Sequence, residues 1–362
     1  MSLASLKTHP APMTSRRAFL AGLAAAALPQ VSWAEVGSPA FLAAGKLGQD
    51  YVLHGLTATG DSLFQIALPA RGHAAAAHPT QALAVAFARR PGTFALVIEC
   101  RAGVVRHRLT PPMGRQFNGH GVFSHDGALL LTSEVVAEGS AGRIGLWETV
   151  GFARVGEWDS HGIGPHDIKL LPDGRVVVAN GGIQTDPADR TKLNLPDMRP
   201  NLTLLSAKGV LVDQVQVAGL PQNSIRHLAL TGHGVAFAMQ WQGDPAEAVP
   251  LVGLWTPGAP VVLGPARDSE ALVMQGYAGS IACGDDGSIA VTSAPGGALM
   301  MFDGAGGPME TLHRADISGV AASGAGFVAT DGQGVVWGLT AGVLTPLARH
   351  QTLWDNHLIA IG

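Results

Sequence analysis

The chain has 362 residues, of which 48 are glycine, 23 are proline and only 14% carry a charge. Its 27 acidic and 23 basic residues give a net charge of −4, which is the wrong sign for a general nucleic-acid binder. Because glycine and proline interrupt the chain at short intervals, long helices have little room. The short Val/Leu/Ala runs between them indicate β structure.

The N-terminal segment has the three parts of an export signal. Paired arginines in Thr14–Leu20 (TSRRAFL) precede the short apolar run Ala18–Leu28, and small residues at Ser32 and Ala34 predict cleavage after Ala34. The arginine pair is typical of a twin-arginine (Tat) signal, with an ordinary Sec signal as the alternative. Since the apolar run is far shorter than the roughly 20 residues that span a bilayer, we expect no stable membrane insertion after cleavage.

Residues 35–362 are then predicted to form the mature protein, a single domain in the periplasm. Removal of residues 1–34 leaves 20 basic and 27 acidic residues, a net charge of about −7. This negative charge again argues against nucleic acid as a partner.

A unit made of a short apolar strand, a glycine-containing turn and a second apolar strand repeats along this domain. Turns such as Pro172-Asp173-Gly174 supply the positive φ that tight hairpins need. The starts of the unit are 35 to 61 residues apart, and four-stranded propeller blades take roughly 40–50 residues each. The unit is assigned to six places, which begin at Val85, His120, His166, His227, Ser280 and Gly319.

A seventh unit is divided between the two ends of the domain. Trp354–Ala360 resembles the start of a unit, and Tyr51–Gly55 with Asp61–Ile66 resembles the rest of one. Pairing of these segments would close a ring and remove exposed sheet edges. We therefore predict an all-β fold, a seven-bladed β-propeller closed by the C-terminal strand joining the N-terminal blade. Six or eight blades, or a two-sheet sandwich, are the alternatives.

Two features between the repeats bear on function. The segment 180–201 is long, polar and proline-containing, and we expect it to be a loop insertion, or lid, over one face of the ring. Cys100 and Cys283 lie in separate apolar runs, so two separately buried thiols are favoured over a disulfide.

Histidine occupies the opening position of four units, at His120, His166, His227 and His357. In a propeller the innermost strand of each blade runs along the central channel, so these positions are expected to converge at its mouth. Imidazole is the commonest protein ligand for metals and suits iron, copper and zinc. We predict a metal site, with iron or copper as the candidate cofactor. Its candidate ligands are His73, His78, His120, His166, His227 and His357.

The alternative is that these histidines are structural and hydrogen-bond to the neighbouring blade. A geometric criterion separates the two cases. If the ring nitrogens of His120, His166 and His227 lie more than about 6 Å apart, joint ligation fails, because metal–nitrogen bonds are only about 2.0–2.1 Å long.

Other polar side chains near the histidines are candidate ligand-binding groups, because arginine and histidine together suit a carboxylate or phosphate. They are Arg71, Arg115, Asn118, Asp167, Arg226 and Gln240. Four further histidines are expected at the surface without a function: His54, His107, His313 and His350. The sequence contains no Gly-x-Ser-x-Gly, His-Glu-x-x-His or Cys-x-x-Cys-His motif that would indicate a hydrolase, a zinc protease or a covalent haem.

Several motifs together resemble a family of uncharacterised, Tat-exported bacterial proteins known only as a domain of unknown function. The motifs include Phe87–Gly92 (FARRPG), Ser160–His166 (SHGIGPH), Ala179–Ile183 (ANGGI) and Ser224–Ala229 (SIRHLA). The resemblance implies a propeller-like fold and a periplasmic role near iron acquisition, because the genes of the family commonly sit beside imelysin-type iron-uptake proteins and a di-haem oxidoreductase. Periplasmic iron-uptake proteins are therefore the expected partners. The resemblance implies no established activity.

One departure from the family weakens a metal role for the 180s loop. Relatives often carry a further histidine after the Gly-Gly-Ile motif, where this chain has Asp186 nearby. Three functions stay open in the order in which we favour them: a metal-binding or ligand-binding protein, a protein-interaction scaffold with structural histidines, and a metal-dependent oxidoreductase.

Overall fold

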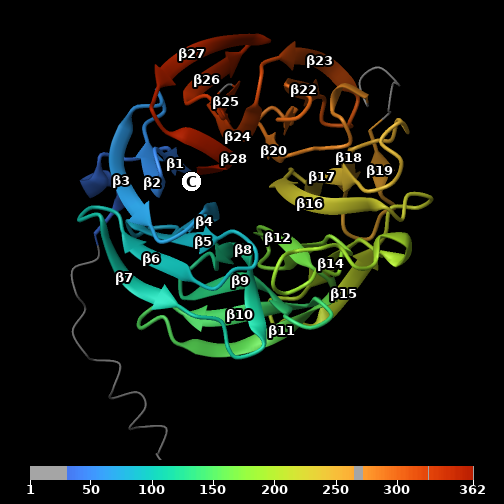
Figure 1. Ribbon diagram of the computed structural model, residues 1–362, viewed down its shortest axis with the longest axis horizontal. Helices are drawn as coiled ribbons and strands as arrows, with labels where there is room; N and C mark the ends of the chain where they lie inside the picture. The colour runs from blue at the N-terminus through green and yellow to red at the C-terminus, as the bar shows by residue number, and fades with distance from the viewer. Residues whose placement is uncertain (1–30, 265–271, 325, 362) are drawn as a thin grey trace, which may run out of the picture. The chain divides into compact units, whose positions relative to one another are not determined.

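The short apolar runs form strands that pair with their neighbours in sequence (Figure 1). The computed structural model describes residues 31–264, 272–324 and 326–361, and the folded unit runs from Ser32 to Gly362. The twin-arginine motif Thr14–Leu20 lies outside the described residues. Within these ranges, no helix is long and apolar enough to cross a membrane.

Twenty-eight strands in the described ranges form seven antiparallel sheets of four strands each. The innermost strands are β28 (Leu353–Ala360), β4 (Gly72–Ala77), β8 (Arg115–Phe123), β12 (Pro165–Leu170), β16 (Asn223–Leu230), β20 (Ser280–Cys283) and β24 (Ile317–Ser323). The second strands are β1 (Phe41–Leu47), β5 (Leu83–Ala88), β9 (Leu129–Val136), β13 (Val176–Asn180), β17 (Val235–Trp241), β21 (Ile289–Ser293) and β25 (Gly326–Asp331).

The third strands are β2 (Asp50–Leu56), β6 (Ala95–Glu99), β10 (Ala141–Glu148), β14 (Asn201–Leu205), β18 (Val252–Trp255), β22 (Ala298–Phe302) and β26 (Val335–Thr340). The outer strands are β3 (Ser62–Leu68), β7 (Val104–Leu109), β11 (Arg154–Ile163), β15 (Leu211–Val215), β19 (Val262–Leu263), β23 (Pro308–His313) and β27 (Val343–Arg349). Short 3-10 helices, η2 (Trp33–Val36) and η3 (Leu195–Asp197), lie outside the sheets.

The seven sheets are the blades of a propeller, as predicted. Each innermost strand contacts the innermost strand of the next blade, and β28 contacts both β24 and β4, so the blades follow one another around a closed ring (Figure 1). Apolar side chains form seven clusters in the described residues, one between each pair of neighbouring blades. The second strands β13 and β21 are buried at every residue because neighbouring blades cover both their faces.

The ring is closed by hydrogen bonding between the two ends of the domain, which confirms the prediction. β28 pairs antiparallel with β1, from Phe41 opposite Ala360 to Lys46 opposite Leu353, with a register shift between Ala43 and Gly45. At Gly45 the strands approach so closely that a Cβ atom would lie 2.7 Å from the carbonyl oxygen of Leu353. A larger residue at this position would push the closing strand away.

The repeat assigned to Val85 was placed one strand too late. The blade begins at β4, and Val85 lies in its second strand. β4 was missed because four of its six residues are alanine, which has a low strand propensity, and because the following turn (Pro79-Thr80-Gln81) has no glycine. With the blade correctly placed, His73 falls on an innermost strand like the other four histidines.

Both cysteines are free thiols, as predicted. Cys100 is buried in the cluster between the β1–β3 and β4–β7 blades, and burial raises its pKa to about 12. Cys283, at the end of β20, is only half-buried. The raised pKa keeps Cys100 protonated and unreactive at neutral pH.

His54 was expected at the surface, and this prediction was wrong: its side chain is buried where the ring closes. Its Nδ1 lies 2.8 Å from the Ser62 hydroxyl, and its Nε2 lies 3.1 Å from the hydroxyl of Thr352, just before β28. The imidazole of His54 also packs edge-on against the indole of Trp354, with 5.1 Å between the ring centroids. Burial, with a smaller effect of His350, lowers the pKa of His54 to about 4.

This pKa makes the closure of the ring sensitive to acid. The folded state disfavours protonation of His54, so the unfolded state binds more protons between the usual pKa of 6.5 and about 4. Stability should therefore fall as the pH drops through this window, by about 2 kcal/mol between pH 7.5 and pH 5 from His54 alone. Urea unfolding of EDTA-treated wild type and His54→Gln at both pH values measures it. The wild type should lose more stability than the variant, and equal losses would contradict this account.

Candidate functional site

Five histidines on the innermost strands lie against one another. They come from five consecutive strands around the ring, namely His357 on β28, His73 on β4, His120 on β8, His166 on β12 and His227 on β16. Their ring centroids are 4.4 Å apart for His73 and His357, and 4.8 Å apart for His120 and His166. His166 and His227 are also 4.8 Å apart. The structure thus brings together five of the six predicted metal ligands.

The nitrogens of these rings are close enough to share an ion. His73, His120 and His357 form one set, and His120, His166 and His227 form a second, with the ligand atoms of each set within 4.8 Å of one another. The criterion of about 6 Å is therefore met. Since three nitrogens spaced evenly around one ion at 2.0–2.1 Å lie about 3.5–3.6 Å apart, the widest pair of a set has to approach by up to about 1.3 Å to bind it.

One pair of nitrogens already has the spacing of ligands on a metal. Nε2 of His73 and Nε2 of His357 are 3.3 Å apart and hydrogen-bond to each other. Two nitrogens bound to one ion at about 2.0–2.1 Å and at a tetrahedral angle lie roughly 3.3–3.4 Å apart. Three other buried ring nitrogens of the cluster have no hydrogen-bond partner: Nδ1 of His73, Nε2 of His120 and Nδ1 of His166.

His120 belongs to both sets and is held by a buried carboxylate. Its Nδ1 lies 3.3 Å from Oδ1 of Asp167, which leaves Nε2 toward the cluster. Burial by itself would raise the pKa of Asp167, but the Lys169 ammonium and His120 outweigh it and hold this pKa well below the usual 3.8. A carboxylate that orients the far nitrogen of an imidazole is a common second layer around protein metal sites.

A glycine makes the close packing of two histidines feasible. Gly119, with φ of +99°, lies beside His73, and a Cβ atom there would be 2.4 Å from its ring carbon Cδ2. The Gly-His sequence of β8 therefore lets His73 and His120 pack at 4.9 Å. Any side chain at position 119 would separate them.

Four of the five histidines are uncharged at neutral pH. Burial, followed by the neighbouring histidines, lowers the pKa of His73, His166 and His227 well below the usual 6.5. Burial also lowers the pKa of His357 to about 3. Neutral imidazole is the form that binds metals, so no proton has to leave these rings first.

A cavity of about 190 Å³ opens beside the cluster and is strongly basic. The strands of each blade are antiparallel, so the end where innermost strands begin is also the end where second strands finish and connect to third strands. Arg89 and Arg90 follow β5 at this end, and Arg226 immediately precedes His227. The lining residues are His73, Arg89, Arg90, His166, Arg190, Lys192, Arg226, His227, Gln240, Tyr277, Asp355 and Asn356.

The predicted loop insertion brings two of these cations to the cavity. It connects β13 to β14, folds back through a bridge between Thr185 and Lys192, and carries Arg190 between them. The side chain of Asn194 fastens its base by donating to the Gly182 carbonyl and accepting from the Gln184 amide. The Gln116 side chain, from β8, donates to the Pro187 carbonyl.

Two of the six predicted ligand-binding residues, Arg226 and Gln240, line this cavity. Asp167 lies behind His120, as described above. Arg71 lies outside the lining and binds Asp355 with its Nε and Nη2 at 2.7 and 2.9 Å. The Asn118 side chain donates to the Pro165 carbonyl and so links β8 to β12.

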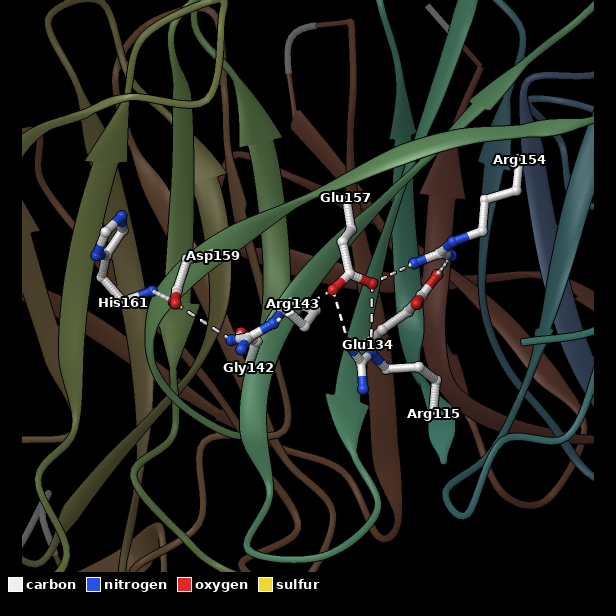
Figure 2. Close-up of polar contacts among 8 residues, drawn as sticks. All are labelled: Arg115, Glu134, Gly142, Arg143, Arg154, Glu157, Asp159 and His161. Carbon is white, nitrogen blue, oxygen red and sulfur yellow. Dashed lines mark hydrogen bonds and ion pairs between the residues drawn. The ribbon is translucent and has the colours of Figure 1, made fainter. Parts of the chain in front are cut away.

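Arg115 belongs to an ion-pair network of the β8–β11 blade rather than to the cavity lining. Figure 2 shows that Arg115 and Arg154 both contact the carboxylate of Glu157. Nη2 of Arg115 lies 2.7 Å from Oε1 of Glu157. Arg154 also binds the buried Glu134 at 2.6 Å. These contacts give Arg115 a structural role in the blade.

His78 lies apart from the other predicted metal ligands. Its Nδ1 accepts hydrogen bonds from the amides of Thr80 and Gln81, at 3.2 and 3.0 Å, and so caps its own turn. Its carbonyl accepts from the Trp33 indole. In the described residues it belongs to neither set of clustered histidines.

Seven lining residues with ionic or polar side chains were not among the candidates: Arg89, Arg90, Arg190, Lys192, Tyr277, Asp355 and Asn356. A signal for two of them was present, because the family-like motif Phe87–Gly92 has paired arginines directly after an apolar strand. Arg190 and Lys192 come from the insertion, whose path over the ring no repeat pattern predicts.

Comparisons with known proteins agree with the fold. Residues 66–361 match the family described as "Protein of unknown function (DUF1513)". Among solved structures, the chain is similar to hydrazine synthase of Kuenenia stuttgartiensis, with a TM-score of 0.57, 13% identity, and coverage of 84% of this chain and 90% of the other. It is also similar to the WD40 repeats of RRP9, with a TM-score of 0.57, 12% identity, and coverage of 78% and 81%. At such identities the likeness concerns the fold alone. No curated protein matches the sequence.

Proposed function

This chain belongs to the DUF1513 family, and we propose that it is an exported binding protein that holds a transition-metal ion at its histidine cluster and serves metal acquisition. The observation that carries the proposal is the meeting of five imidazoles from five separate blades. Buried polar atoms are normally hydrogen-bonded, so three unpartnered ring nitrogens in one cluster suggest a ligand that they bind.

The donor set limits the choice of metal. Imidazoles suit iron, copper and zinc, and the cluster contains no thiolate. Each of the two sets offers three nitrogens, which would hold one ion together with an external ligand, and His120 is shared by both sets. Iron and copper are the favoured cargo, and the resemblance to a family encoded beside iron-uptake proteins favours iron in the cell. Periplasmic iron-uptake proteins are the proposed partners.

Loss of His120 should lower the affinity for metal more than loss of any other histidine of the cluster, because His120 belongs to both sets. Titration of EDTA-treated protein with Cu²⁺, Zn²⁺ and Fe²⁺ by calorimetry should give about one ion per chain. His120→Ala should weaken binding by more than about 100-fold, and Asp167→Asn, which removes only the orienting carboxylate, by about 10- to 100-fold.

The matched control is His313→Ala, because His313 is exposed on the outer strand β23. It should bind as wild type does. Equally weak binding by wild type and His120→Ala would contradict the metal proposal and favour a scaffold with structural histidines. Mass spectrometry of protein purified from the periplasm then identifies the metal carried in the cell.

Export through the Tat route is part of the proposal. It is supported by the motif Thr14–Leu20 and by the small residues before the expected cleavage point after Ala34. If the protein folds before export, the metal would bind in the cytoplasm, and the metals available there would determine which ion occupies the cluster. In the folded unit Trp33 donates to the His78 carbonyl at 2.9 Å, a contact that cleavage after Ala34 would remove.

Replacement of the arginine pair tests this route. The double variant Arg16→Lys/Arg17→Lys should accumulate as precursor in the cytoplasm, because the Tat receptor reads the arginines rather than positive charge alone. Fractionation and N-terminal sequencing measure the outcome. Undiminished export of the variant would assign the segment to the Sec route.

A further inference from the structure

The cavity beside the histidines has far more positive than negative charge. Five cations line it: Arg89, Arg90, Arg190, Lys192 and Arg226. Its one carboxylate, Asp355, already binds Arg71 through both oxygens at 2.7 and 2.9 Å. This concentration of positive charge stands out in a domain whose net charge is about −7.

The cations have little compensation from the protein. Arg226 is 4% exposed, and its Nε has no hydrogen-bond partner. Burial and then the neighbouring arginines lower the pKa of Arg90 to about 9, and burial followed by Arg71 lowers the pKa of Arg89. Among the described residues, no carboxylate forms an ion pair with Arg89, Arg90 or Arg226. Such crowding costs folding free energy, which an anionic ligand would offset.

Neutral donors complete the cavity. The Tyr277 hydroxyl accepts a hydrogen bond from the Asn356 amide, so its own proton is available to a ligand. The Gln240 amide makes only a long contact of 3.5 Å to the Ala278 carbonyl. Guanidinium and hydroxyl donors at several points around one cavity match the oxygens of carboxylates and phosphates.

We propose that this cavity is a binding site for a small oxyanion with two or more negative charges. A water needs only about 10–15 Å³ of such space, so 190 Å³ holds a small molecule, and it is below the roughly 300–1,000 Å³ of sites for drug-sized ligands. Phosphate and di- or tricarboxylates share the required chemistry.

The position of the cavity links the anion to the metal. His73, His166 and His227 line the cavity and also belong to the two clustered sets. An oxyanion there would lie within reach of an ion on the histidines and could occupy an open coordination position. This coupling rests on the proposed metal function, whereas the anion site itself rests on the cations alone. The cargo it implies is a metal–oxyanion complex.

Calorimetry on EDTA-treated protein tests the anion site without metal. Inorganic phosphate and citrate are the two probes, and they distinguish a phosphate from a carboxylate ligand. At least one should bind with a stoichiometry of one, and acetate, with a single charge, should bind at least tenfold more weakly. Arg226→Gln and Arg90→Gln should each weaken binding by about thirtyfold or more, while Arg349→Gln, which removes an exposed arginine of the outer strand β27, should not.

Thermal unfolding provides a second measurement that a folding defect cannot imitate. Without anion, Arg90→Gln should unfold at the same or a higher temperature than wild type, because one repelling charge is gone. At an anion concentration that saturates the wild type, wild type and Arg349→Gln should gain equal stability, and Arg90→Gln should gain clearly less. Absence of binding by both probes, or binding unchanged in both cavity variants, would overturn the proposal even if metal binds.

Measuring anion binding in the presence and absence of metal distinguishes the oxyanion site from the proposed metal function. If anion and metal are coupled, each should strengthen the binding of the other by the same factor. Anion binding to a protein that takes up no metal would support the oxyanion site and contradict the metal function. Metal binding without any anion binding would do the reverse.

Discussion

The packing of blade against blade is the constraint on which the site depends. A four-stranded sheet with two apolar faces has to cover both, and here seven apolar clusters fill the spaces between neighbouring blades. The pairing of β28 with β1 completes the ring, so no blade is left with an uncovered face. Once the ring is closed, the innermost strands are held side by side. Residues at equivalent positions on neighbouring blades therefore lie close together.

The five histidines follow from this geometry. Each lies on an innermost strand, and only the closure of the ring places His357, from the end of the chain, beside His73, with 4.4 Å between the centroids of their imidazole rings. β20 and β24 carry no histidine, so the cluster occupies one side of the ring. The cations of the β5–β6 and β13–β14 connections lie at the same end of the blades because neighbouring strands are antiparallel. The imidazole nitrogens that could bind a metal and the cationic side chains that could bind an anion are thus neighbours.

The repeat pattern predicted the fold and most of the cluster because it reports what every blade shares. Strand, turn and second strand are local, and an opening histidine is visible at His120, His166, His227 and His357. His73 was not assigned to this pattern because its strand, β4, is rich in alanine and was not identified as a strand. Its spacing does fit the repeat, because it precedes His120 by 47 residues and His120 precedes His166 by 46. The basic cavity was not predictable in this way, because Arg190 and Lys192 come from an insertion without a repeat. His54 was misjudged since its burial depends on Thr352 and Trp354, nearly 300 residues away.

Anomalous X-ray scattering from crystals of the metal-loaded protein tests the central claim most directly. It locates the ion relative to the imidazoles without relying on affinity or on a variant that folds. The account predicts one strong peak within about 2.0–2.3 Å of nitrogens from at least three of the five histidines, His120 among them. A loaded crystal with no peak in the cluster, in which His73 and His357 keep their contact of 3.3 Å, would contradict it.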